Sequence, residues 1–136
     1  MIKLTHLIRE NSLRLDSKVQ RLERKLLRKF PQLQELIIHI NSNGSLYIKV
    51  IRVQKEYRGQ GIGSKVIEFI KKFADEYGLI ISLSPEPESG YKSKLDKFYK
   101  NLGFIANKGR HKDYQLSSPF GKSMYRRPID NKESGQ

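Results

Sequence analysis

The sequence predicts a single domain of mixed α/β class, in which helices pack against a mixed β-sheet. Apolar residues recur with helical spacing in three segments, and short apolar runs typical of strands lie between them. Residues 46–83 read as strand, glycine-rich turn, helix and strand, which is the order of a right-handed βαβ unit. With 136 residues the chain can build one core, and we expect residues 1–127 to form the domain and 128–136 a flexible C-terminal tail.

A long amphipathic helix is predicted over Ser12–Phe30, with Ser12 as its N-cap and Pro31 as its stop. Its apolar positions follow the spacing i, i+4, i+7, i+11: Leu15, Val19, Leu22 and Leu26. A second row with similar spacing is basic: Arg14, Lys18, Arg21, Lys25 and Arg28. At about 100° per residue the two rows lie on different faces, so we expect one face to pack and the other to expose cations. Only Ile2–Ile8 is left before this helix for a first strand.

A β-hairpin and a second helix follow. The hairpin strands are Leu36–Ile40 and Leu46–Val53, and the connection between them contains the Asn-Gly pair typical of tight turns. The helix runs from about Ile62 to Tyr77, with Gly78 placed where a C-cap glycine belongs. The run Leu79–Leu83 is short and continuously apolar, which predicts a strand buried on both faces.

The C-terminal part predicts one more helix and two short strands. Residues 84–92 contain two prolines and a glycine and read as a loop. The helix is expected over Ser93–Leu102, with Ser93 as N-cap and Gly103 as stop. Phe104–Ala106 starts a strand, and Ser123–Arg127 can return as its antiparallel partner.

Composition limits the classes of function. The chain carries 27 lysines and arginines against 14 acidic residues, a net charge of +13, and such a field attracts polyanions and phosphorylated cofactors. A merely solubilising surface is the alternative. There is no cysteine, which excludes disulfides and thiolate zinc sites, and we expect no metal. No run approaches the roughly 18 apolar residues of a membrane span, and no secretory signal is visible, so we expect a cytoplasmic protein without membrane contact.

Three alternating glycines stand at the junction of the second hairpin strand and the following helix: Gly59, Gly61 and Gly63. Glycine permits a tight turn and a close approach of ligand, and the first N–H groups of a helix point outward with partial positive charge. Arg58 and Lys55 add full charges beside the turn. The segment therefore predicts a site for a phosphate or pyrophosphate.

Two common phosphate-binding patterns do not fit this segment. A Walker loop needs Gly-Lys-Ser/Thr, and the order here is Gly63-Ser64-Lys65. A dinucleotide fold needs GxGxxG and an acidic residue about 20 positions further on, whereas the spacing here is GxGxG and the next strand ends without an acid. A tight turn without a ligand stays open as the simplest reading.

The same segment resembles a motif of the GNAT acetyltransferases. Residues 58–63, RGQGIG, are similar to the family pattern Q/R-x-x-G-x-G/A, and residues 94–104, KLDKFYKNLGF, resemble its later helix A-x-x-x-Y-x-x-x-G-F. The two matches fall within Leu46–Ala106, less than half of the chain. The resemblance implies a GNAT fold in which two central parallel strands, here Leu46–Val53 and Leu79–Ser84, splay apart to admit acetyl-CoA.

By this resemblance, pantetheine meets the backbone of Ile51 and Val53, beside Arg52, as an added strand would. The resemblance assigns the pyrophosphate to the residues of the glycine segment: Arg58, Gly59, Gln60, Gly61, Ile62, Gly63 and Ser64. Tyr99 matches the family tyrosine near the coenzyme sulfur and is the candidate general acid. Its simpler reading is a core tyrosine.

The general base is not assigned. Where many relatives carry a glutamate on the cofactor strand, this chain has Lys49 and Arg52. His39, Glu86 and Glu88 are alternatives, and bound water or a low-pKa amine can also suffice. Lys92 replaces an asparagine that contacts pantetheine in many relatives, which leaves the side-chain contacts to the middle of the cofactor open.

The sequence thus predicts an acetyltransferase that moves an acetyl group from acetyl-CoA to an amine on a protein or on an aminoacyl-tRNA. The net charge disfavours polyamines as acceptors. The alternative is a non-catalytic module that binds RNA or DNA through the Arg14–Arg28 row and the Lys108–Lys112 cluster. Because relatives often pair through terminal strands, a homodimer is a further expectation.

Overall fold

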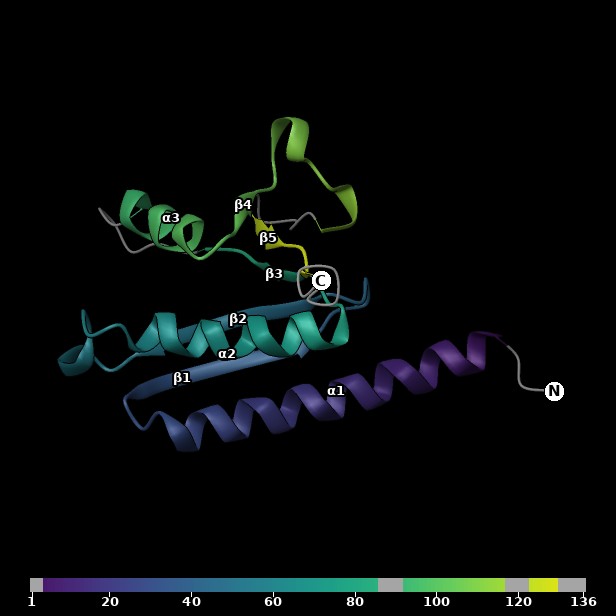
Figure 1. Ribbon diagram of the computed structural model, residues 1–136, viewed down its shortest axis with the longest axis horizontal. Helices are drawn as coiled ribbons and strands as arrows, with labels where there is room; N and C mark the ends of the chain where they lie inside the picture. The colour runs from purple at the N-terminus through teal and green to yellow at the C-terminus, as the bar shows by residue number, and fades with distance from the viewer. Residues whose placement is uncertain (1–3, 86–91, 117–122, 130–136) are drawn as a thin grey trace, which may run out of the picture.

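The computed structural model describes residues 4–85, 92–116 and 123–129, and the side chains of 4–13, 92, 93 and 115 are not described. Within these ranges the chain forms three α-helices and one five-stranded sheet (Figure 1). The helices and strands in chain order are α1 Leu4–Lys29, β1 Leu33–Ile40, β2 Leu46–Val53, α2 Ile62–Tyr77, β3 Ile81–Leu83, α3 Lys92–Asn101, β4 Ile105–Ala106 and β5 Met124–Arg126. The predicted mixed α/β class is confirmed.

The sheet has the order β1-β2-β3-β5-β4, and only the β2–β3 pair is parallel among the described strands. This pair and α2 form the predicted βαβ unit. Its ladder ends where Ile48 meets Leu83, although β2 continues to Val53. The register of β1 and β2 skips Lys49 at this point, which marks a β-bulge in β2. Since a bulge bends its strand and disrupts the ladder, it explains why β2 leaves β3, as the expected splay requires.

Helix α1 is longer than the sequence analysis predicts. It begins at Leu4, so Ser12 lies inside the helix and is not its N-cap, and residues 4–8 do not form a strand. Val19, Leu26 and Phe30 are buried in the core, as the apolar row predicts. Nothing in the segment 4–29 stops a helix, because it contains neither proline nor glycine.

Two polar side chains of α1 bind the backbone of β1, an edge strand of the sheet. Glu23 Oε2 accepts from the Ile38 N–H at 2.9 Å, and Gln20 Nε2 donates to the Ile38 carbonyl at 3.3 Å. These contacts satisfy backbone groups that an edge strand otherwise leaves open. They also fix the rotation of α1 about its own axis.

Helix α2 buries Val66, Ile67, Ile70 and Ala74 and lies beside α1 (Figure 1). Phe30, the residue after α1, packs edge to face on Phe69 of α2, with ring centroids 5.8 Å apart. Gly78 ends α2 in the left-handed conformation, with φ of +66°, which confirms the predicted C-cap.

The C-terminal elements differ from the predictions by one or two residues. Helix α3 starts at Lys92, so Ser93 is not its N-cap, and β3 starts at Ile81 rather than Leu79. Gly103, with φ of +96°, follows α3 as predicted. Residues 130–136 of the predicted tail lie outside the described residues. None of the helices in the described part of the chain has the length and hydrophobicity that a bilayer crossing requires.

Candidate functional site

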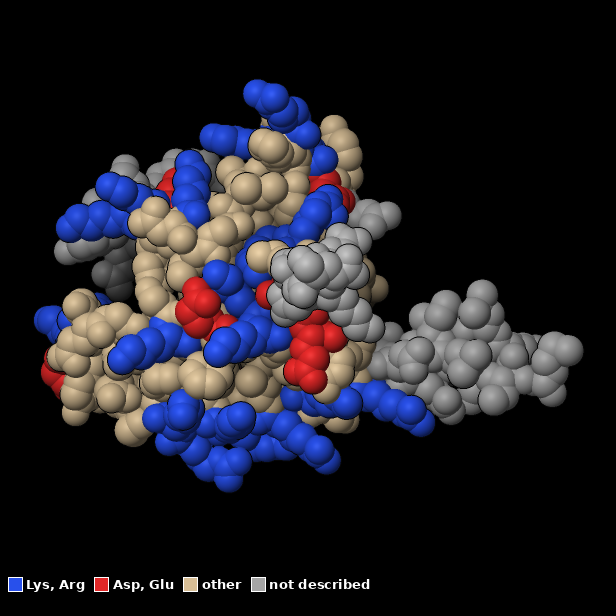
Figure 2. All heavy atoms as spheres, in the orientation of Figure 1, with Lys and Arg blue, Asp and Glu red and all other residues tan. Residues whose placement is uncertain are grey.

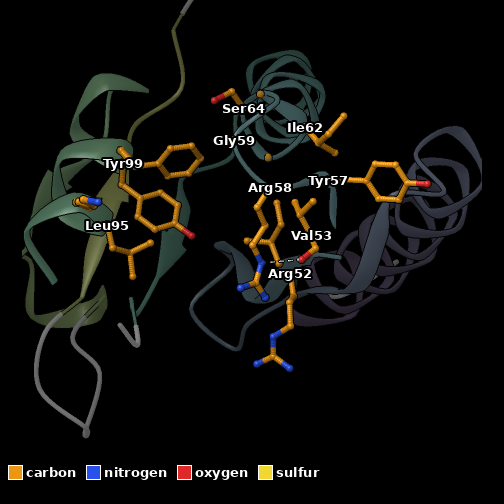
Figure 3. Close-up of a pocket in the computed structure, with 14 residues that line it drawn as sticks. Arg52, Val53, Tyr57, Arg58, Gly59, Ile62, Ser64, Leu95 and Tyr99 are labelled. Atoms are coloured by element: carbon orange, nitrogen blue, oxygen red, sulfur yellow. Dashed lines mark hydrogen bonds between the residues drawn. The ribbon is translucent and has the colours of Figure 1, made fainter. Parts of the chain in front are cut away.

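A cavity of about 760 Å³ lies between the end of β2, the start of α2 and the inner face of α3 (Figure 3). It adjoins the part of β2 that lies beyond the end of the β2–β3 ladder. Most of its lining is apolar or glycine, and the charged lining residues are all basic. The lining residues are Ile51, Arg52, Val53, Tyr57, Arg58, Gly59, Gly61, Ile62, Gly63, Ser64, Lys94, Leu95, Phe98 and Tyr99.

The glycine turn shapes one end of this cavity. Gly59 and Gly61 have φ of +83° and +79°, a region that L-residues with a side chain rarely adopt. The first helical hydrogen bond of α2 runs from the Lys65 N–H to the Gly61 carbonyl at 3.1 Å. The amides of Ile62, Gly63 and Ser64 precede that bond and have no acceptor inside the helix. The turn therefore offers N–H groups and the positive end of the helix dipole to an anion.

Basic side chains reinforce the positive potential of the cavity. Arg58 turns back toward β2, and its Nε donates to the Val53 carbonyl at 3.1 Å (Figure 3). Arg52 lies 3.8 Å from Glu35 in an ion pair whose two side chains are about half exposed. Lys94 reaches the cavity from α3. Because no acidic residue is among the lining residues, the cavity is suited to a ligand with several negative charges.

Tyr99 enters the cavity from α3 on the side opposite the glycine turn (Figure 3). Its side chain is buried, with 6% of the residue exposed, and packs edge to face against Phe98 and Phe104 at 5.1 and 5.7 Å between centroids. Burial raises the pKa of the Tyr99 hydroxyl to about 12. The hydroxyl is protonated at neutral pH, as an ordinary tyrosine is, and it is a weaker acid than one exposed to water.

The structure brings together all of the predicted site residues except one. Gln60 is exposed and does not line the cavity, while the other predicted positions and Tyr99 do. Their roles toward a cofactor stay predictions. Four lining residues are not among the predicted site residues: Tyr57, Lys94, Leu95 and Phe98. Leu95 lies four residues before Tyr99 on the same side of α3 and could have been found from it, whereas Lys94, Phe98 and Tyr57 do not share that spacing.

The alternatives for a general base lie elsewhere or outside the described residues. His39 lies at the hairpin end of β1, where it pairs with Tyr47, while Val53 at the cavity pairs with Leu33. Its Nε2 is 2.9 Å from Asn41 Oδ1, which gives the ring a structural partner. Lys49 is exposed, and Glu86 and Glu88 are not described. Among the described residues, no group of histidines and carboxylates could hold a metal ion.

A buried hydroxyl marks the β3 side of the gap. Ser84 follows the last residue of β3, and its Oγ is buried without a hydrogen-bond partner in the described structure. Buried polar groups are nearly always paired, so an orphaned hydroxyl beside a gap in a sheet is a candidate contact for a polar ligand atom.

Comparison with known proteins places the chain in a family. A family model described as an acetyltransferase (GNAT) domain matches residues 32–106, more than half of the 136 residues. This segment contains β1, β2, α2, β3, α3 and β4 and therefore includes every residue that lines the cavity. No protein of the curated set matches the chain significantly.

Solved structures with the same fold are also found. A GNAT-family acetyltransferase from Staphylococcus aureus Mu50 matches with 23% identity and a TM-score of 0.51, over 69% of this chain and 57% of its own. A proposed N-acetyltransferase from Lactobacillus plantarum matches with 16% identity and a TM-score of 0.51, over 69% and 59%. The alignments thus span less than two thirds of these proteins, and at such identities the likeness concerns the fold.

Proposed function

Because the chain belongs to the GNAT acetyltransferase family, we propose that it transfers an acetyl group from acetyl-CoA to an amine acceptor. One observation carries this proposal. Beyond the end of the parallel β2–β3 ladder, β2 lines a basic cavity that has the glycine turn at one end and Tyr99 at the other. A thioester cofactor with a pyrophosphate would place its pyrophosphate at the glycine turn and its sulfur beside the tyrosine.

The residues of the cavity fit coenzyme A. A Cβ built on Gly59 or Gly61 would meet no atom within 4 Å, so the backbone of the turn is open to a ligand. Ile51, Val53 and Leu95 offer an apolar wall to the pantetheine arm. The cavity volume of about 760 Å³ lies within the range of roughly 300–1,000 Å³ that is usual for ligand sites.

When bound, acetyl-CoA supplies an activated acetyl group whose transfer releases a thiol. The amides that begin α2 and the Arg58 guanidinium would hold the pyrophosphate, and the free side of β2 beyond Ile48 would pair with pantetheine. Tyr99, which is protonated at neutral pH, would donate its proton to the departing sulfur. The acceptor amine must arrive neutral, and we propose a protein amine or an aminoacyl-tRNA amine as its source.

Thermal unfolding in the presence of acetyl-CoA tests cofactor binding. Saturation at about 100 times Kd should stabilise the protein by about 2.7 kcal/mol and raise Tm by several degrees. ATP at the same concentration is the control, because a basic surface also binds polyphosphates without selecting coenzyme A. An equal shift with both ligands, or no shift, would refute the enzyme and favour the non-catalytic polyanion-binding alternative. Mass spectrometry of extract treated with labelled acetyl-CoA would then identify the acceptor.

Replacement of Tyr99 by phenylalanine tests the proton donor. The packing of the ring is kept, so we expect Tm and the KM for acetyl-CoA to change little while kcat falls at least ~10-fold. Tyr57→Phe is the matched control, since Tyr57 also lines the cavity but its side chain is exposed. Equal kcat in the Tyr99→Phe variant and the wild type would remove Tyr99 from the reaction.

A further inference from the structure

The outward face of α1 carries a dense band of cations (Figure 2). The members of this band, which we call the α1 basic face, are all exposed: Arg14, Lys18, Arg21, Arg24, Lys25, Arg28 and Lys29. At 100° per residue they occupy less than half of the helix circumference. The helix rises about 21 Å from Arg14 to Arg28.

Between Arg14 and Lys29, the two acidic residues of α1 are directed away from this face. Asp16 and Glu23 lie on the opposite side of the helix, and both are partly buried. Glu23 accepts from the Ile38 N–H at 2.9 Å, so its carboxylate is engaged with β1. In the described part of the chain, no ion pair involves a member of the α1 basic face. The ion pairs among the described residues therefore leave the positive charge of the face without a counter-charge.

The face extends onto α2 through an aromatic side chain. Lys29 of α1 and Lys72 of α2 both lie over the Phe69 ring, with Nζ 5.3 and 6.0 Å from its centroid. At the other end of the contact, Lys18 Nζ donates to the Tyr77 hydroxyl at 3.2 Å. The two helices thus present one basic surface on a rigid support.

The C-terminal end of α1 lies near the end of β2 that lines the cavity. The Gln54 N–H donates to the Gln32 carbonyl at 2.8 Å, and Gln54 Nε2 donates to the Pro31 carbonyl at 3.0 Å. These bonds join the segment after α1 to the segment between Val53 and the glycine turn. A long partner lying along the face would therefore end near the cavity.

We propose that the α1 basic face, with Lys72, docks the phosphodiester backbone of a nucleic acid. A regular row of exposed cations on a straight helix matches a polymer with regularly spaced charges, and neutralising it releases counterions. An anionic membrane fits less well, because the apolar row of α1 is turned into the core. Among the α1 side chains that the structure describes, residues 14–29, Leu27 is the one large apolar side chain that is exposed, at 37%. This docking goes beyond acetyl transfer and does not depend on it.

Fluorescence anisotropy with labelled 20-nucleotide duplex and single-stranded DNA and RNA tests the docking. The triple variant Arg21→Glu/Lys25→Glu/Arg28→Glu should weaken binding at least ~10-fold at 100 mM salt. The slope of log K against log salt should become shallower by about 2 to 3, because about 0.9 is lost per phosphate contact. Comparison of the four probes identifies the form of nucleic acid that is bound.

The control is the variant Lys97→Glu/Lys100→Glu/Lys108→Glu, which changes the net charge equally at exposed positions outside α1. It should bind within ~2-fold of the wild type. Equal weakening in both variants would show a general charge effect and overturn the proposal, as would tighter binding to phosphatidylserine vesicles than to any nucleic acid. The Tm shift with acetyl-CoA, measured on the same variants, should stay unchanged whether or not the docking is correct.

Discussion

Gly61 and Gly63 lie in the same turn but differ in what they require of the backbone. Gly61 has φ of +79° and is the N-cap of α2, whereas Gly63 lies within the helix and has no positive φ. A Cβ on Gly61 would meet no neighbour within 4 Å, so any cost there comes from backbone conformation. A Cβ on Gly63 would lie 3.5 Å from Phe98 Cζ, an ordinary contact distance.

We therefore predict opposite outcomes for two alanine substitutions. Gly61→Ala should lower the free energy of unfolding by about 1 kcal/mol and weaken acetyl-CoA binding at least ~10-fold, because the turn must leave its left-handed conformation. Gly63→Ala should unfold at or slightly above the wild-type temperature, because alanine favours a helix. Thermal unfolding with and without acetyl-CoA measures both effects. Equal loss in the two variants would contradict the role of φ at Gly61.

At the residue scale, the glycine turn could be predicted from the sequence, whereas the opposite side of the cavity could be predicted only in part. Alternating glycines between a strand and a helix indicate an anion site from local physics alone. Tyr57 and the orphaned Ser84 hydroxyl carry no local signal, because their places depend on how distant segments meet. The bulge at Lys49 is likewise a property of strand register.

Among the secondary-structure elements, β5 is joined to α2 by a buried ion pair. Arg126 donates to both carboxylate oxygens of Asp75, at 2.9 and 3.0 Å, and the Ile129 N–H also donates to Asp75. Burial by itself raises the pKa of Asp75, but the hydrogen bonds and charge of Arg126 and the Ile129 amide outweigh it, so the pKa lies below 3.8. The charged form of Asp75 therefore stabilises the fold above that pH.

Asp75→Asn should lower the free energy of unfolding by about 3 kcal/mol at pH 7, because Arg126 would be left buried without its counter-charge. In the wild type, the stabilisation by ionised Asp75 should decrease as the pH falls below about 3.8. It should be lost once the pH passes the lowered pKa that Asp75 has in the folded state. Urea denaturation at pH 7 and pH 3 should show a difference between variant and wild type that shrinks in acid.

The control for this element is Glu35→Gln, which removes the exposed pair with Arg52. It should cost less than about 1 kcal/mol at either pH, since exposed ion pairs contribute little. A comparable loss in both variants would mean that the bidentate pair does not hold β5 to α2.

The type of each helix and strand was predicted more accurately than its ends. Periodic apolar residues define α1 and α2, but a serine inside a good helix-forming sequence is not a boundary, and α1 continues from Ser12 back to Leu4. Conversely, β1 starts three residues earlier than the predicted Leu36, because Leu33 finds a partner in Val53. Such ends are set by neighbouring elements, which local sequence does not specify.

For the whole molecule, the net charge of +13 is spread unevenly, and α1 alone carries eight basic and three acidic residues. Like charges at i, i+3 and i, i+4 repel by about 0.2–0.5 kcal/mol per pair. Salt screens this repulsion, so we predict that Tm rises by about 3 °C between 20 and 300 mM NaCl. The Arg21→Glu/Lys25→Glu/Arg28→Glu variant should show a smaller rise. A Tm that falls with salt would mean that attractive pairs dominate the surface.

The contacts of Glu23 and Gln20 with Ile38 also bear on self-association. An incoming strand from a second chain would need the Ile38 N–H and carbonyl to extend the sheet beyond β1, and α1 already binds both. This edge is thereby protected against the strand-to-strand aggregation that open edges invite. If two copies pair through their sheets, as the predicted homodimer would, the seam must form at the opposite edge, beside β4.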